Sequence, residues 1–191
     1  KNMQSVVLFE YFMRRVGNCF EEFAIMVTED EYDYFLWKEE IFQAIEEKQW
    51  KKVRELLESK EAIIEVMDVC EKKIRWQFYA YIYGILEAVE HNDWKTATQY
   101  FKDAGIQTNP NMFETLESDI SLSVMELHIL LLYLYFGIKA KEIEIKTGKQ
   151  LFYQLESYIH DGRMELEEQA KIYPKLVCVG LQIFENDMEF T

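Results

Sequence analysis

Apolar side chains recur every three or four residues along almost the whole chain, and this spacing predicts helices. Short helices are expected on either side of Gly17, and Thr28 with Glu31 three residues later predicts a capped start for a long helix that runs through Gln49. Further helices are predicted over residues 50–59, 61–93, 94–104, 121–143, 146–159 and 166–186. No segment alternates apolar and polar residues for long, so the expected fold class is all-α.

Turn signals are few, and they mark the ends of these helices. The stretch GIQTNPN, residues 105–111, gathers Gly, Asn and Pro and predicts the clearest loop in the chain. Ser121 or Ser123 is expected to cap the apolar helix that follows. Pro174 falls inside the last predicted helix, where it either begins the packed part or kinks the helix.

Two stretches of the chain repeat at an interval of 44 residues. WKKVRELLESK starts at Trp50 and WKTATQYFKDA starts at Trp94, and each follows a short polar turn. The same shift aligns other pairs of similar residues: Trp37 with Tyr81, Ile41 with Ile85, Ala44 with Ala88, Val53 with Ala97 and Leu57 with Phe101. This agreement predicts one antiparallel helical hairpin used twice.

The composition agrees with a few long helices. The chain has 191 residues, 49% of them hydrophobic and 15% aromatic, with 7 glycines and 2 prolines. A chain of this length can bury the core of one sizeable domain or of a short repeat array. The 21 basic and 35 acidic side chains give a net charge of −14. Because such a surface repels phosphate, this chain is not itself expected to grip nucleic acid.

The cysteines and apolar runs indicate a cytoplasmic protein. Cys19, Cys70 and Cys178 are widely spaced and odd in number, which favours neither a disulfide framework nor a zinc site. The longest apolar run, residues 127–138, is too short to span a membrane, and no signal-peptide pattern occurs. The chain begins at Lys1 without an initiator Met, so we expect it to be part of a longer protein.

No pattern of residues predicts an enzyme. His91, His128 and His160 are too far apart to form a metal-binding pair at helical spacing. The stretch KTGK, residues 146–149, lacks the upstream glycine and strand of a phosphate-binding loop, and no GxSxG nucleophile motif occurs. Acidic pairs lie on helix faces, where water solvates them. We therefore expect no catalytic residue, no metal and no cofactor.

The repeated hairpin resembles the tetratricopeptide (TPR) repeat. Ala97, Phe101 and Ala104 match the small, aromatic and small positions of the second TPR helix, and Tyr81 and Ala88 match positions of the first. A third unit places Gly148, Phe152 and Leu155 at the same three positions. The intervals of 44 and 51 residues depart from the family's shorter repeat.

This resemblance implies a right-handed α-solenoid of antiparallel helix pairs. A linker with N-terminal helices would occupy residues 1–27, and the repeat domain residues 28–191. The units are expected at about 28–60, 66–105, 121–160 and 166–191, the last without its second helix.

A narrower resemblance rests on four stretches in a fixed order: LFEYFMRRVG, then FEEFAIMVTEDEYDYFLWKEEIFQAIEEKQW, then LSVMELHILLLYLYFGI, then EEQAKIYPKLVCVGL. Together they are similar to the regulatory region of Firmicutes helix-turn-helix transcription regulators. The resemblance implies a TPR-like array that dimerises and, in peptide-sensing members, holds a signalling peptide in its concave face. DNA would be bound only by a helix-turn-helix domain that lies outside this chain.

The same resemblance predicts a binding groove, because the first helices of successive TPR units line the concave face. The groove candidates are Tyr79, Tyr83, Glu90, His128, Tyr133 and Gln182. A tyrosine offers an apolar ring with a polar tip, which suits an extended peptide. In the alternative interpretation these tyrosines only pack between units.

Two other functions remain open at this point. The chain could be a general TPR interaction scaffold with no link to DNA. It could also be a relative of the TPR-containing aspartyl phosphatases that act on response regulators. The second function would need a catalytic amide or carboxylate from an N-terminal helical bundle, and the region before Thr28 is short for one.

Overall fold

The structure is a computed structural model that describes residues 29–64, 69–113, 122–160, 164 and 166–188. These residues form seven α-helices and no strand, which confirms the all-α class. The predicted helices before residue 28 lie outside this part of the chain. The helices are α2 (Glu29–Glu46), α3 (Trp50–Ile64), α4 (Val69–Leu86), α5 (Trp94–Thr108), α6 (Val124–Lys139), α7 (Ile145–His160) and α8 (Leu166–Met188), with a π-helical segment η2 (Glu87–His91) after α4.

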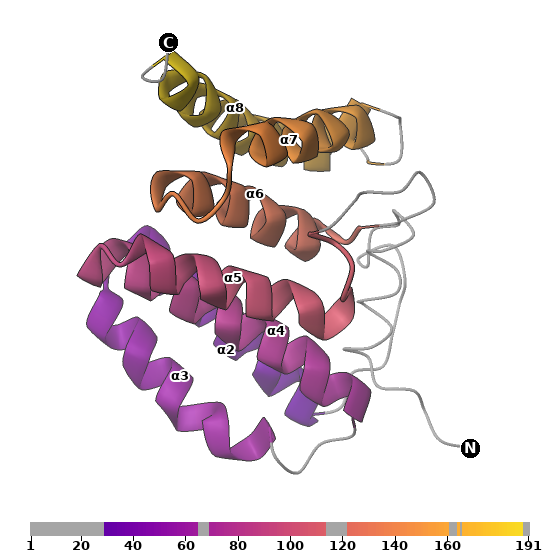
Figure 1. Cartoon of the computed structure of the whole chain (residues 1–191). Helices are drawn as coiled ribbons and strands as arrows, with labels where there is room; N and C mark the ends of the chain where they lie inside the picture. The colour runs from indigo at the N-terminus through magenta and orange to yellow at the C-terminus, as the bar shows by residue number, and fades with distance from the viewer. Residues whose placement is uncertain (1–28, 65–68, 114–121, 161–163, 165, 189–191) are drawn as a thin grey trace.

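Consecutive helices pack side by side and build up the molecule in layers (Figure 1). In the first layers the ring of Trp37 on α2 lies 5.5 Å from that of Phe78 and 5.4 Å from that of Tyr79, both on α4. Helix α5 contacts α4 on one side and α6 on the other, with Phe101 stacked on Phe136 of α6 at 5.8 Å. Helix α8 rests on both α6 and α7. One continuous core therefore runs through the described helices.

The 44-residue repeat is visible in the local backbone. Trp50 and Trp94 are the first residues of α3 and α5. The turns before them each contain one left-handed residue, Lys48 with φ 57° and Asn92 with φ 53°, again 44 positions apart. The aligned side chains Val53, Ala97, Leu57 and Phe101 are all fully buried. The two turns thus share a left-handed residue at the same place and the same buried inward positions, although only the second follows a π-helical segment.

The predicted loop at residues 105–111 is wrong in its first half. Helix α5 continues through Gly105 to Thr108. Gly105 is buried, and a Cβ atom there would collide with the side chains of Met112 and Phe113. This glycine therefore permits a close approach inside a helix and does not mark a turn. The chain leaves the helix only at Asn109.

Helix α6 also ends earlier than predicted, at Lys139 and not near Ile143. Lys141 adopts a left-handed φ of 60°, and the carbonyl of Gly137 accepts the N–H groups of both Glu142 and Ile143. Ile143 folds back over Gly137, at the place where a larger residue's Cβ would stand. An apolar residue that closes a helix end by packing on it looks, in sequence, like one more helical position.

The start of α6 follows the prediction, whereas the packed part of α8 begins before Pro174, because Ile172 is already buried. Ser123 accepts from the N–H of Glu126, whose side chain accepts in turn from the N–H of Ser123, which completes a capping box. Pro174 lies inside α8, and the helix continues through it. Among the described helices, none is long and apolar enough to cross a lipid bilayer.

Candidate functional site

The six groove candidates lie on three helices that alternate along the chain with α3, α5 and α7. Tyr79 and Tyr83 are on α4 and Glu90 is in η2 directly after it. His128 and Tyr133 are on α6, and Gln182 is on α8. Their surroundings differ, and they fall into packed and accessible groups.

Tyr79 belongs to the packed group. Its side chain is 1% exposed, and its hydroxyl donates to the carbonyl of Leu57 on α3 over 3.2 Å. The ring also lies beside those of Trp37 and Trp76, at 5.4 and 6.0 Å. Tyr79 thus joins α2, α3 and α4, which corresponds to the packing interpretation of the tyrosines.

Tyr83 and Glu90 are partly accessible and lie seven residues, about two turns, apart on the α4–η2 segment. The ring of Tyr83 stacks on that of Tyr100 of α5, with centroids 5.9 Å apart. Glu90 accepts two hydrogen bonds from Arg54 of α3, at 2.8 Å from Nε and 2.6 Å from Nη2. The first contact holds Tyr83 against α5, and the second holds Glu90 against α3.

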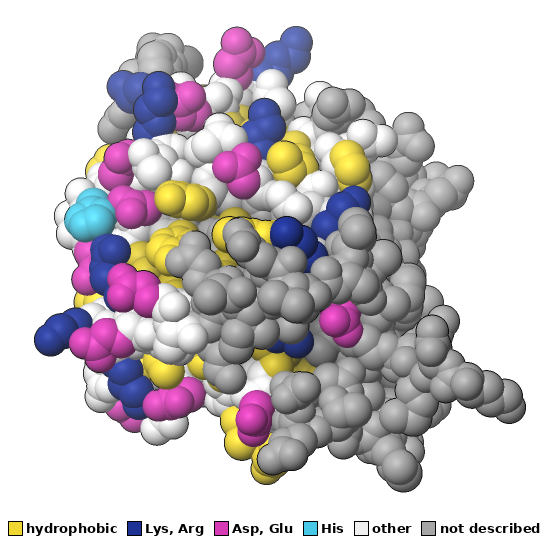
Figure 2. Space-filling view, turned by 90° about the horizontal axis from the view of Figure 1, so that it is seen from below, with side chains coloured by type: hydrophobic (Ala, Val, Ile, Leu, Met, Phe, Trp, Pro, Cys, Tyr) yellow, Lys and Arg dark blue, Asp and Glu magenta, His cyan; other side chains and the backbone are white. Residues whose placement is uncertain are grey.

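An open pocket of about 530 Å³ adjoins Glu90 and the turn between α2 and α3. Trp50 and the three lysines Lys48, Lys51 and Lys52 also line it. Lys52 pairs with Glu40 at 2.9 Å and Lys51 with Glu55 at 3.7 Å, so the lysine charges are partly balanced. Figure 2 shows basic and acidic side chains interspersed in this way on the underside of the molecule, with hydrophobic ones between them. Its lining combines one indole ring with charged and polar side chains.

His128 faces the last helix. Its Nε2 lies 3.2 Å from the ammonium nitrogen of Lys175 on α8. Burial, and next the positive charge of Lys175, lower the pKa of His128 to about 4. At neutral pH the imidazole is therefore uncharged, and Nε2 accepts a hydrogen bond from Lys175. Burial also lowers the pKa of Lys175. This contact connects a groove candidate to α8.

Tyr133 and Gln182 complete the set of candidates. The ring of Tyr133 lies 4.4 Å from that of Phe113, and burial raises the pKa of its hydroxyl. Gln182 is half-buried, and its backbone carbonyl accepts a hydrogen bond from the side-chain amide of Asn186, one turn later. Tyr133 thus points toward the end of α5, whereas His128 points toward α8.

A buried polar relay across three helices was not predicted from the sequence. Gln77 of α4 donates to the hydroxyl of Thr108 on α5 over 2.6 Å, and Thr108 donates to Glu126 of α6 over 2.8 Å. Gln77 and Glu126 are 2% and 0% exposed. Only the capping-box spacing of Ser123 and Glu126 gave a signal in sequence. The relay connects the middle of α4 with the end of α5 and the start of α6, and so fixes the register of the three helices.

Arg75 is a second polar residue that sequence reasoning did not identify. It is 8% exposed, and its guanidinium carbon lies 3.9 Å from the ring centroid of Tyr34 on α2. Its Nε has no hydrogen-bond partner among the residues that the structure describes. A cation over a tyrosine ring is stabilised by the ring's quadrupole, so Arg75 helps to hold α4 on α2.

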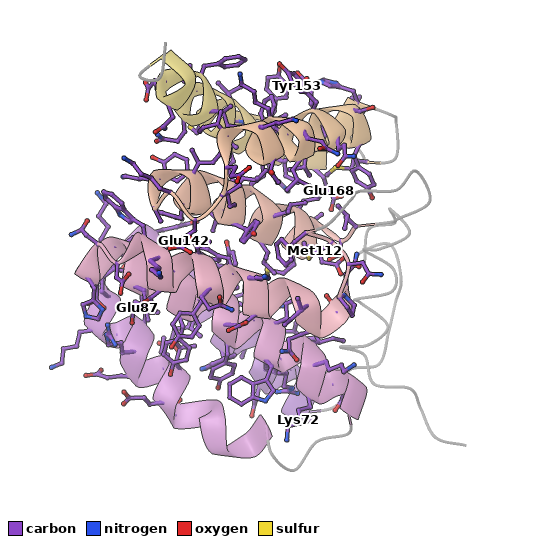
Figure 3. All side chains as sticks on the ribbon, in the orientation of Figure 1. Lys72, Glu87, Met112, Glu142, Tyr153 and Glu168 are labelled. Atoms are coloured by element: carbon purple, nitrogen blue, oxygen red, sulfur yellow. The ribbon has the colours of Figure 1, made fainter. Side chains whose placement is uncertain are left out.

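Ion pairs and a cation–π contact join neighbouring hairpins where their turns lie. Figure 3 shows Glu87 and Glu142 at this edge. Lys95 of α5 pairs with Glu142 after α6 at 3.0 Å, and the ammonium of Lys139 lies 4.1 Å from the ring centroid of Trp94. The turn edge thus holds charged contacts, while the buried relay lies at the other end of α5 and α6.

In the part of the chain that the structure describes, no three His, Cys, Asp or Glu side chains converge as a metal site would require. Comparison with family models, curated proteins and solved structures finds no match to this chain. Tyr83 and Glu90 on the α4–η2 segment offer an aromatic surface and a paired carboxylate, and His128, separately on α6, offers a neutral imidazole. These are groups that bind and orient a ligand.

Proposed function

We propose that the chain is the sensor and dimerisation domain of a helix-turn-helix transcription regulator. In this proposal the helix pairs form a right-handed solenoid of TPR-like units, and a peptide or small ligand binds in its concave face. The observation that carries the proposal is the repeated hairpin. In each copy a residue with left-handed backbone conformation, Lys48 or Asn92, comes two positions before the Trp that begins the next helix. Stacked hairpins of one kind expose their first helices side by side, which makes an extended surface for a peptide.

The accessible candidates define what such a ligand would offer. The stacked rings of Tyr83 and Tyr100 present a flat apolar surface with hydroxyl tips, which suits an apolar side chain of a peptide. Glu90 and the lysines at the pocket beside it can pair with the ends of a peptide. A net charge of −14 favours a neutral or basic peptide, because it repels an acidic one over the whole surface.

A ligand in this groove would act through the packing between units. Tyr83 is stacked on α5, and His128 is bonded to Lys175 of α8, so contacts at the groove reach helices on both sides of it. A ligand shifts an equilibrium only when it binds one arrangement of the helices better than the other. In the proposed mechanism the favoured arrangement changes how two subunits present their DNA-binding domains.

Two experiments test this function. The first reads the coding sequence upstream of Lys1. A helix-turn-helix domain there supports the regulator, whereas a start codon directly upstream leaves the general interaction scaffold as the better proposal. The second selects linear peptides from a random library on the chain and measures their affinity by fluorescence anisotropy.

Variants of the groove decide where the selected peptides bind. Tyr83→Ala and Glu90→Gln should each weaken binding about tenfold, since partly buried contacts of this kind contribute roughly 1–2 kcal/mol. Ile106→Ala on α5 is the matched control, because it removes an exposed apolar side chain that is not a groove candidate. Equal affinity of all three variants would place the peptides elsewhere and contradict the groove.

A further inference from the structure

Helix α8 has two apolar faces. One face is buried against α6 and α7 and consists of Ile172, Leu176, Val179 and Ile183, each at most 2% exposed. The other face is exposed. It carries Leu166, Tyr173, Val177, Leu181 and Phe184, whose exposed fractions range from 44% to 83%. Both sets have the three- and four-residue spacing that keeps side chains on one side of a helix.

These exposed residues are concentrated at one end of the molecule. The described part of the chain has ten large exposed hydrophobic side chains, and five of them are on this face of α8. A sixth, Tyr153, is on α7, and Figure 3 shows it at the end of the molecule that α7 and α8 form. Phe152 of α7 packs where a Cβ of Gly180 would stand, so the two helices touch beside the exposed face. We call Tyr153 and the five α8 residues the end patch.

We propose that the end patch is the docking surface for a second copy of this chain, with the two α8 helices packed antiparallel about a twofold axis near Cys178. This inference deepens the proposed function, because it rests on the homodimer and names the surface that forms it. A twofold interface uses the same residues from both copies, and a single apolar stripe on a helix meets that requirement.

The charges beside the stripe favour the antiparallel arrangement. Lys171 and Glu185 are both exposed, and each lies seven residues from Cys178. A twofold axis at Cys178 places Lys171 of one copy opposite Glu185 of the other, and does so twice. A parallel arrangement in register would instead place Lys171 beside Lys171. Complementary charges at the rim of an interface select orientation in this way.

The size of the end patch fits a specific interface. Six large side chains that are about half exposed carry about 500 Å² of apolar surface, given that a whole aromatic side chain can bury ~150–250 Å². Two copies would thus bury about 1,000 Å² of apolar surface, and the polar residues on the flanks bring the total into the range of stable complexes. The 23 residues of α8 span about 34 Å, enough for several turns of contact.

A charge exchange tests the proposal without disturbing the core. Lys171→Glu and Glu185→Lys should each weaken the dimer about tenfold at low salt, because each creates two like-charge contacts per dimer. The double variant Lys171→Glu with Glu185→Lys should restore the affinity, since each new charge again faces its opposite. Analytical ultracentrifugation gives the dissociation constants. Failure of the double variant to recover while both single variants are weakened would overturn the antiparallel register.

Two further variants test the patch itself. Leu181→Glu should abolish the dimer with an unchanged far-ultraviolet circular dichroism spectrum, whereas Ile106→Ala, the control on α5, should leave it intact. In a Cys19→Ser and Cys70→Ser background, a short bismaleimide should join two chains through exposed Cys178. A chain that stays monomeric, or a dimer that keeps its affinity with Leu181→Glu and gives no cross-link, would overturn the proposal. Selected peptides binding to a monomer would then show that the sensor function stands without it.

Discussion

The hairpin of α2 and α3 and the hairpin of α4, η2 and α5 share a turn but differ in their neighbours. Both begin the second helix with Trp and both bury the aligned side chains Leu57 and Phe101 completely. In the part of the chain that the structure describes, α3 packs mainly against α2 and α4 and reaches η2 through Arg54, whereas α5 is packed between α4 and α6. Phe101 therefore reaches ring partners on both sides, Tyr81 at 6.3 Å and Phe136 at 5.8 Å. The repeat specifies the hairpin, and the place of the hairpin in the stack determines what each residue holds.

The largest expected difference concerns these two buried positions. Phe101→Ala should lower the free energy of unfolding by about 3–5 kcal/mol, because it leaves a cavity between three helices. Leu57→Ala should cost less, about 2–3 kcal/mol, since fewer helices surround the space. Urea denaturation followed by circular dichroism gives both values. An equal loss for both variants would mean that the neighbours of α5 do not matter.

A third region, the His128–Lys175 contact between α6 and α8, should differ from the two hairpins because its contribution to stability depends on pH. The pKa of His128 is lowered to about 4 when folded, against 6.5 for an ordinary histidine. The unfolded chain thus binds the proton more tightly, so this contribution to stability is present above pH 6.5 and is lost as the pH falls toward 4. The loss should reach roughly 2–3 kcal/mol. The stability difference between the wild type and His128→Gln, measured from pH 7.5 to 4, should change by this amount, and a constant difference would contradict the prediction.

The two left-handed turn residues should respond differently to glycine. Lys48→Gly should raise stability by about 0.5–1 kcal/mol, because a lysine with positive φ is strained. Asn92→Gly should change stability by less than about 0.5 kcal/mol, since asparagine tolerates this conformation. Thermal unfolding of the two variants, with Lys141→Gly as a third turn of the same kind, measures the ranking. A stabilisation as large at Asn92 as at Lys48 would contradict the argument.

The smallest effects belong to the ion pairs at the turn edge. Arg54 and Glu90 have side chains 35% and 24% exposed, so Arg54→Ala should cost about 0.5 kcal/mol after solvent screening. Lys95 and Glu142 are more exposed, at 75% and 41%, and Lys95→Ala should produce no measurable loss. Repeating both denaturation experiments in 1 M salt should remove the difference between them. A loss at Arg54 that persists in salt would point to packing of its aliphatic stem.

Helix positions and the repeat could be predicted from sequence because they depend on local spacing. The Ser123–Glu126 cap and the Trp50 and Trp94 helix starts are signals of this kind. Gly105 and Ile143 misled the prediction, because their roles depend on residues that pack over them from outside the helix. The same limit applies to the site. Tyr79 and Tyr83 look equivalent in sequence, yet only the first is enclosed by α2, α3 and α4.

Corresponding positions of α3, α5 and α7 also predict which substitutions should occur together. At the first of two inward positions the second helices carry Val53, Ala97 and Gly148, and four residues later they carry Leu57, Phe101 and Phe152, all of them buried. Where the first residue is smaller than valine, the second is aromatic, so the larger ring offsets part of the volume lost at the first position. A change in side-chain volume at one position can thus be offset by the opposite change at the other. Val53→Ala and Leu57→Phe should therefore be better tolerated as a pair than either is alone, and related sequences should vary the two together.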